Sequence, residues 1–310
     1  MFIIGTIFKE KIELDEEYDE ISSDNSNDEE FCVPSSQQYF FVRAALKMKN
    51  DAYWIGPLGD PSNWEFKTFQ EKTPEWFNLE EYEEKFRMAV QDWWNRHVHI
   101  NENLESLRNG YSILKDCTVE CLEGNAKAIL ADSRVKVMKD NAIVYEMFGS
   151  SIVQYMRNES NIYEVRDKSM VGEMRDFSRI NALCDSSSVQ EMYDKSCVLT
   201  MYHNSSITEM SGFSRIDTMN GNSIVRKMHD YTCIRCLCNS SEVSEMYGDS
   251  IVMIMYNNNV KKMHDFAMIR NMPRDAHVCE MTSNAMAIAQ GIKESEIWIS
   301  GETDFTFCHV

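Results

Sequence analysis

The amino-acid sequence predicts a mainly β protein, in which a β-solenoid of nine-residue repeats over residues 111–290 follows a small α+β domain over residues 31–110. Three observations lead to this prediction. Methionine recurs every nine residues, a β-branched residue stands three positions before it, and in most units a turn-forming residue stands two positions after it. The recurring methionine, or the residue in its place, is called the marker below.

The marker series continues through seventeen units. Every step is nine residues except one step of eight after Met255, and fourteen units carry methionine. The markers are Met138, Met147, Met156, Val165, Met174, Leu183, Met192, Met201, Met210, Met219, Met228, Leu237, Met246, Met255, Met263, Met272 and Met281. A repeat that holds over so many units indicates a stack of similar structural elements.

The pattern within a unit indicates one short strand and one turn. A small residue, mostly serine, precedes the β-branched residue by two positions, so both side chains can point inward from one extended strand. The interval of three to the marker breaks this period of two and predicts a corner. A helical repeat is excluded, because nine residues make two and a half helical turns and would place successive markers on opposite faces.

Alternate units differ, which predicts two units, or 18 residues, per coil. Three residues after the marker, one half of the units carries Phe177, Lys195, Phe213, Tyr231, Asp249 and Phe266, and all the aromatic residues at this position fall in that half. The other half carries Lys168, Ser186, Asn204, Asn222, Ser240 and Asn258. We expect the four aromatic residues to form a partner-binding edge, because contiguous exposed aromatic side chains mark interaction surfaces. The alternative is that the rings tuck into the turn and cover the neighbouring coil.

The segments on either side of the repeat have their own patterns. Before it, residues 39–46, 52–55 and 64–69 read as strands, residues 56–61 as a turn, and Asn78 as the N-cap of a helix. Leu79, Tyr82, Phe86, Val90 and Trp93 would form the buried face of that helix. After it, residues 291–310 are expected to form a strand or hairpin that caps the last coil.

The net charge of −19 is unevenly distributed along the chain. Residues 1–110 hold 23 acidic and 11 basic side chains, whereas residues 111–290 hold 23 and 19, so the repeat is close to neutral. We expect residues 1–30 to be an acidic, disordered arm. It either solubilises the chain or engages a basic partner through Glu13, Asp15, Glu16, Glu17, Asp19 and Glu20.

Localisation is expected to be cytoplasmic. There is no apolar run of about 18 residues, and the first 20 residues turn acidic before a signal-peptide cleavage site. The ten cysteines are scattered over a long chain, so we expect them to be reduced.

The motifs of common enzymes and metal sites are missing. The sequence has no phosphate-binding glycine loop, no nucleophile elbow, no zinc-protease motif and no calcium-binding nonapeptide signature. Cys233, Cys236 and Cys238 lie close together, but no second cluster stands at ligand spacing. The repeat shows no acidic ladder suited to glycoside hydrolysis in the half of the units where it would be needed. We therefore expect no cofactor, no metal and no catalysis.

The repeat units, for example residues 194–201 and 222–228, resemble the methionine-containing nonapeptide repeats of proteins from gut bacteria and their phages. This resemblance covers roughly 150 residues and implies the solenoid fold without implying an activity. A looser likeness is to pentapeptide-repeat proteins, whose acidic β-helices mimic duplex DNA, although the period here is nine.

These observations favour a non-enzymatic protein that binds a protein partner. The leading hypothesis is a binding or inhibitory protein, encoded by a phage or mobile element and acting on a factor in the host cytoplasm. The alternatives are a structural component of a virion or surface assembly, and a nucleic-acid mimic. Homo-oligomerisation is left open, and neither membrane association nor direct nucleic-acid binding is expected.

Overall fold

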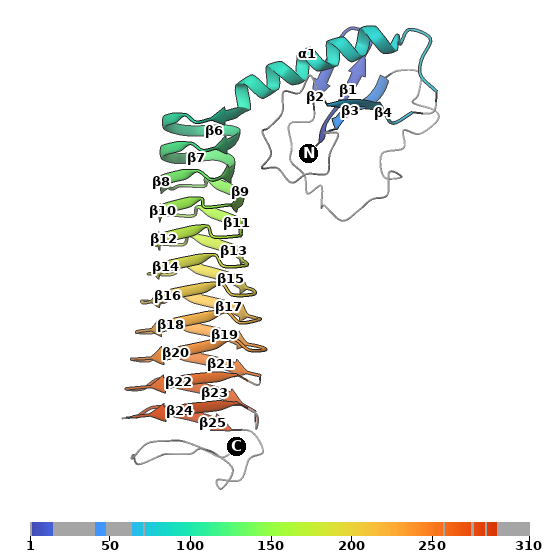
Figure 1. Ribbon diagram of the computed structural model, residues 1–310. Coiled ribbons are helices and arrows are strands. Elements are labelled where there is room, and N and C mark those ends of the chain that lie inside the picture. The colour runs from blue at the N-terminus through green and yellow to red at the C-terminus, as the bar shows by residue number, and fades with distance from the viewer. Residues whose placement is uncertain are drawn as a thin grey trace. The chain divides into compact units, whose positions relative to one another are not determined.

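The computed structural model describes residues 2–14, 41–47, 64–70, 72–256, 258–273, 276–282 and 284–289. The chain divides into two compact units, residues 1–97 and 98–310 (Figure 1). The strand expected at 52–55, the turn at 56–61 and the cap at 291–310 lie outside the described residues.

The N-terminal unit contains a four-stranded antiparallel sheet with the strand order β2-β1-β3-β4. The strands are β1 (Phe2–Phe8), β2 (Ile12–Leu14), β3 (Phe41–Lys47) and β4 (Glu65–Thr68). The strands expected near 39–46 and 64–69 are thus confirmed. By contrast, the expected arm does not begin at residue 1, because β1 pairs along its whole length with β3. This pairing joins distant segments, so the acidic composition that follows β1 gave no sign of it.

Helix α1 (Leu79–His97) begins where the sequence predicted. The side-chain oxygen of Asn78 accepts a hydrogen bond from the backbone N–H of Glu81 at 3.2 Å, which confirms the N-cap. Glu81 also pairs with Lys85 at 2.6 Å on the solvent side.

The buried face of α1 is close to the expected one. Tyr82, Phe86, Val90 and Trp93 are all buried. The prediction that Leu79 is buried is wrong, because this residue is 55% exposed. It is the first residue of the helix, where the chain has not yet completed the turn that packs on the sheet.

The C-terminal unit is a β-solenoid, as predicted. Figure 1 shows short strands stacked in coils along one axis. All of its strand pairings are parallel. From β8 onwards they link every second strand, so that Met156 of β10 (Ile152–Met156) aligns with Met138 and Met174 in the adjacent coils. Each coil therefore holds two units and 18 residues, which confirms the predicted coil length.

The first three strands of the solenoid precede the clear repeat, and two of them are long. They are β5 (Val98–Ile100), β6 (Asn103–Lys115) and β7 (Thr118–Ala131). The parallel sheet thus begins at Val98, before the register of markers starts. The two longest strands, β6 and β7, pair over most of their length.

The remaining strands are nearly uniform, and those from β8 to β24 end at a marker or, in β9, one residue after it. They are β8 (Arg134–Met138), β9 (Ile143–Phe148), β11 (Asn161–Val165), β12 (Met170–Met174), β13 (Arg179–Leu183), β14 (Ser188–Met192), β15 (Cys197–Met201), β16 (Ser206–Met210), β17 (Arg215–Met219), β18 (Ile224–Met228), β19 (Cys233–Leu237), β20 (Glu242–Met246), β21 (Ile251–Met255), β22 (Asn259–Met263), β23 (Met268–Met272), β24 (His277–Met281) and β25 (Met286–Ala289).

Three inward rows form the core of the solenoid. From Met138 to Met263 every marker is at most 1% exposed, and the β-branched residue three positions before it is fully buried. The small residue two positions before the β-branched one is also buried in most units; Ser178 and Ser214, for example, are fully buried. The unbranched methionine side chain suits these corner positions, because it adapts to irregular space.

The eight-residue step after Met255 moves one residue, Asn258, from the outer row into the core. The sequence register assigned Asn258 to the outer row, but its side chain is 2% exposed and occupies the position of the buried serines. Its amide donates hydrogen bonds to the backbone oxygens of Asn239 and Ser241 at 2.6 and 3.0 Å. Where the chain is one residue shorter, this longer polar side chain therefore supplies hydrogen bonds to backbone oxygens of the neighbouring coil.

Candidate interaction edge of the solenoid

The turns along one edge of the solenoid all have the same conformation. Two residues after the markers of β12, β14, β16, β18, β20 and β22, the backbone takes a positive φ between 53° and 69°. These six residues, called the turn row, are Asp176, Asp194, Gly212, Asp230, Gly248 and Asp265. Aspartate and glycine suit the row because they tolerate this left-handed conformation better than most residues do.

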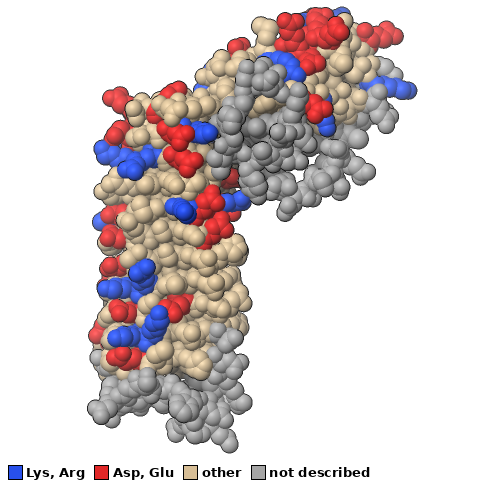
Figure 2. Space-filling view, viewed as in Figure 1, with Lys and Arg blue, Asp and Glu red and all other residues tan. Residues whose placement is uncertain are grey.

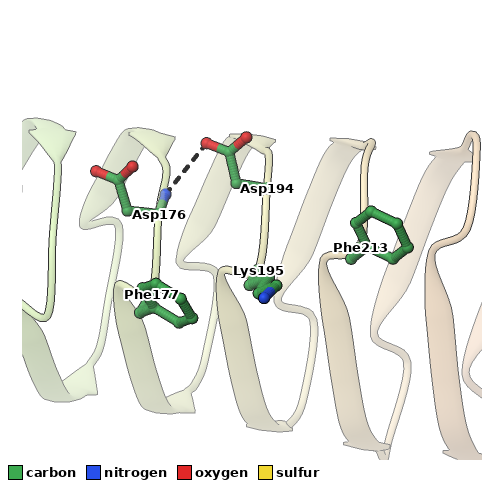
Figure 3. Close-up of a pocket in the computed structure, with 5 residues that line it drawn as sticks. All are labelled: Asp176, Phe177, Asp194, Lys195 and Phe213. Carbon is green, nitrogen blue, oxygen red and sulfur yellow. Dashed lines mark hydrogen bonds between the residues drawn. The ribbon is translucent and has the colours of Figure 1, made fainter.

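The turn row also links neighbouring coils. The backbone N–H of Asp176 donates a hydrogen bond to the carboxylate of Asp194 at 3.2 Å (Figure 3). Gly212 donates in the same way to Asp230, at 3.0 Å. Backbone bonds run alongside, such as the 2.7 Å bond from the N–H of Phe213 to the oxygen of Asp194. The edge is therefore held rigid, and the carboxylates are oriented along the solenoid.

The next residue of each turn forms the predicted aromatic edge. We use this name for Phe177, Lys195, Phe213, Tyr231, Asp249 and Phe266, one from each of six successive coils. The three phenylalanines are each 60% exposed and Tyr231 is 58% exposed. The rings therefore project into solvent. This differs from the alternative in which they tuck into the turn and cover the next coil.

Neighbouring side chains of the aromatic edge contact one another along the solenoid. Phe213 and Tyr231 are stacked with ring centroids 5.3 Å apart and an interplanar angle of 10°. The ammonium of Lys195 lies 5.2 Å from the centre of the Phe177 ring. Between Phe177 and Phe213, above Lys195, the surface has a shallow hollow of about 260 Å³, which Asp176 and Asp194 also line (Figure 3).

The opposite edge of the solenoid lacks such a row. At the equivalent position after the odd-numbered strands stand the short or flexible polar residues that the sequence predicted, including Ser186 and Asn204. Two tyrosines of that edge, Tyr202 and Tyr256, are 40% and 53% exposed, but they lie three coils apart. The two edges are therefore chemically distinct.

Sequence reasoning missed a second ring row beside the aromatic edge. His229, Tyr247 and His264 each follow a marker directly, and their rings stack with centroids 5.0 and 4.8 Å apart. The hydroxyl of Tyr247 donates a hydrogen bond to the Glu245 carboxylate at 2.8 Å, and this bond raises the pKa of the phenol. The nine-residue register could have revealed this row, had the position next to the marker been compared between coils.

Sequence reasoning also missed a short row of glutamates at the position just before the marker. Glu173, Glu191 and Glu209 are in register on β12, β14 and β16. Glu173 contacts Arg157 and Arg175 at 2.6 Å each. Burial alone would raise the pKa of Glu173, but the hydrogen bonds from the two arginines outweigh it, and the pKa is lowered.

The other two glutamates of this row also have partners. Glu191 accepts a hydrogen bond from Tyr193 at 2.9 Å, and Glu209 lies 3.6 Å from His229. The row therefore consists of carboxylates engaged with neighbouring side chains. These contacts give the glutamates a structural role on the outer surface of β12, β14 and β16.

The thiols in the described part of the chain belong to no cluster of metal ligands. The eight cysteines of this part form no disulfide with one another. Within the same residues, no group of three or more histidine, cysteine, aspartate or glutamate side chains is arranged to hold a metal ion. Burial raises the pKa of Cys233 and Cys238, which disfavours the thiolate form that binds metals.

The expected acidic arm lies mostly outside the described residues. Of its six named carboxylates, only Glu13 is described, in strand β2, where it pairs with Lys11. Asp15, Glu16, Glu17, Asp19 and Glu20 lie outside the described part.

Charge on the solenoid is mixed. On the face shown in Figure 2, basic and acidic side chains are interspersed along the coils. Among the residues that are described, no helix is long and apolar enough to cross a membrane.

Comparison with protein-family models, with curated proteins and with solved structures found no match to this chain.

Proposed function

We propose that this protein is a non-enzymatic binding protein whose solenoid presents the aromatic edge to a protein partner. The observation that supports this most directly is the exposure of Phe177, Phe213, Tyr231 and Phe266, each between 58% and 60%, within six successive coils. Aromatic side chains gain free energy when they leave water, and they dominate the energetics of protein interfaces.

The rigidity of the edge supports the same conclusion. Every turn is joined to its neighbours by backbone hydrogen bonds, and several are also joined by aspartate carboxylates. A partner would therefore meet rings that already hold their positions, so that little conformational entropy is lost on binding.

The charge pattern favours a protein partner over mimicry of nucleic acid. A mimic of duplex DNA needs a continuous acidic surface. On the solenoid face shown in Figure 2, acidic and basic side chains are interspersed, and many carboxylates, such as that of Glu173, form ion pairs.

A double substitution tests the proposal. Phe213→Ser/Tyr231→Ser removes the central stacked pair, and Tyr202→Ser/Tyr256→Ser on the opposite edge is the matched control. Association with other proteins of the source cell and with itself would be measured together with the melting temperature. We expect the first variant to lose association and to melt within about 3 °C of the unsubstituted protein, because its rings are mostly in solvent.

The control should keep both its association and its stability. Two outcomes would contradict the proposal. In one, the Phe213→Ser/Tyr231→Ser variant retains full association; in the other, it melts far below the control while still binding, which would make the edge purely structural.

A further inference from the structure

We propose that the partner of the aromatic edge is a second copy of this chain, docked with its solenoid antiparallel to the first. This inference rests on the proposed function, since it names the occupant of the same edge. The two copies would be related by a twofold axis perpendicular to the solenoid, passing between the coils of Phe213 and Tyr231. Such a contact uses the same surface on both copies.

The order of residues along the aromatic edge is self-complementary when it is reversed. From β12 to β22 it is Phe177, Lys195, Phe213, Tyr231, Asp249 and Phe266. In an antiparallel pair, Lys195 of each copy faces Asp249 of the other, and Phe213 faces Tyr231. The outermost phenylalanines then also face each other. Every charged residue of the edge thus meets an opposite charge, and every ring meets a ring.

The turn row gives independent support. The twofold axis places this row against the turn row of the second copy. Its two glycines, Gly212 and Gly248, then lie opposite Asp230 and Asp194, respectively. Four of the six positions therefore avoid two facing carboxylates. Only the outermost pair, Asp176 and Asp265, brings like charges together.

A parallel arrangement lacks this complementarity. There each residue would face its own counterpart, so Lys195 would meet Lys195 and Asp249 would meet Asp249. Facing like charges disfavour an interface strongly. The aromatic edge therefore determines both where the two copies contact each other and that their solenoids run antiparallel.

Both charged side chains are available for the contact. Lys195 and Asp249 are exposed, and neither forms an ion pair within the described ranges of the chain. The ammonium of Lys195 lies over the Phe177 ring, which leaves its remaining donors free for a carboxylate.

The size of the contact predicts a reversible dimer. Six coils spaced about 4.8 Å apart are separated by five intervals, so the strip is about 24 Å long. One edge of this length buries less than the roughly 800 Å² per partner of a standard stable interface, so we expect a dissociation constant in the micromolar range.

A charge exchange tests the proposal. The full-length protein would be studied by sedimentation equilibrium from about 1 to about 300 µM, a range that brackets the expected dissociation constant. Lys195→Asp alone and Asp249→Lys alone each create two like-charge pairs, and each should weaken the dimer at least about tenfold. The variant that carries both substitutions exchanges the charges and should dimerise again.

Mixing the two single variants gives a second readout. One copy would carry two acidic residues and the other two basic residues at these positions, so the mixture should form a heterodimer although each variant alone is mainly monomeric. Thermal melts of all variants serve as the folding control. Both positions are exposed, and melting temperatures close to that of the unsubstituted chain are expected.

Two results would overturn the inference. They are a chain that stays monomeric over the whole concentration range, and a doubly exchanged variant that dimerises no better than the single ones. If the chain is monomeric but Phe213→Ser/Tyr231→Ser abolishes binding of another protein, the inference fails while the proposed function stands. If the chain dimerises but the exchange has no effect, the antiparallel docking is wrong.

Discussion

Met210 gives the sharpest test of the inward and outward assignment in the solenoid. Its side chain is fully buried on β16, in register with Met192 and Met228. Met210→Ala removes three heavy atoms from the core. At about 0.8 kcal/mol for each methylene-sized group, the transfer loss is about 2.4 kcal/mol, and the remaining cavity raises the total to roughly 3 kcal/mol. Met210→Asp should cost more, because it buries a charge without a partner.

The neighbouring residue supplies the control. Glu209 points outward with its side chain 40% exposed, and it stands in register between Glu191 and Lys227. Glu209→Lys would gain an attraction on one side and a repulsion on the other, while it loses the contact with His229. We expect a cost of about 0.5 kcal/mol or less.

Urea unfolding followed by circular dichroism would measure these effects. Midpoints should be compared instead of single free energies, because long repeat arrays depart from two-state behaviour. The expected order of stability is Glu209→Lys, then Met210→Ala, then Met210→Asp as the least stable. Equal midpoints for Glu209→Lys and Met210→Asp would show that the assignment of faces is wrong.

Two further predictions concern the turns and the pH dependence. Asp167 has a φ of 56° and accepts a 2.8 Å hydrogen bond from the N–H of Gly149; Asp167→Ala should cost about 2 kcal/mol, whereas Asp167→Asn keeps an acceptor and should cost about 0.5 kcal/mol. Equal melting temperatures for the two variants would contradict this role. Because the pKa of Glu173 is lowered in the folded protein from 4.5, its contribution to stability is present above that value and is lost as the pH falls below it. Glu173→Gln should therefore destabilise the protein at pH 7, and the difference from the unsubstituted chain should shrink as the pH falls towards about 3; a difference that stays constant would refute the ion-pair explanation.

The sequence predicted the solenoid well because the core of every coil demands the same residues. A marker such as Met210 must fit between its counterparts one coil away, so the same residue class returns every 18 positions. The two halves of a coil have the same structure, which shortens the period to nine. The β1–β3 pairing could not be found in this way. Residues 2–8 and 41–47 meet only in the folded chain, and no repeat connects them.

The candidate site was predicted only in part, for a related physical reason. The exposed position of Phe213 follows from the register, because the turn places it outside the three inward rows. The stacking of His229 on Tyr247 depends on how far adjacent coils are apart and on how each side chain turns. The burial of Asn258 depends on how the chain closes over one missing residue. Neither can be read from a periodic pattern.

The outward rows therefore carry the information that distinguishes one solenoid from another. If the aromatic edge served only to cover the next coil, rings would suffice at all six positions. The residue type at one end of the row would then be independent of the residue type at the other end. Instead, Lys195 and Asp249 interrupt the rings at positions that mirror each other, and Gly212 and Gly248 interrupt the turn row where a reversed copy would bring Asp230 and Asp194. Packing within one chain does not explain why the charges of the aromatic edge mirror each other, or why the glycines of the turn row lie opposite aspartates in a reversed copy. Pairing of two antiparallel copies explains both arrangements.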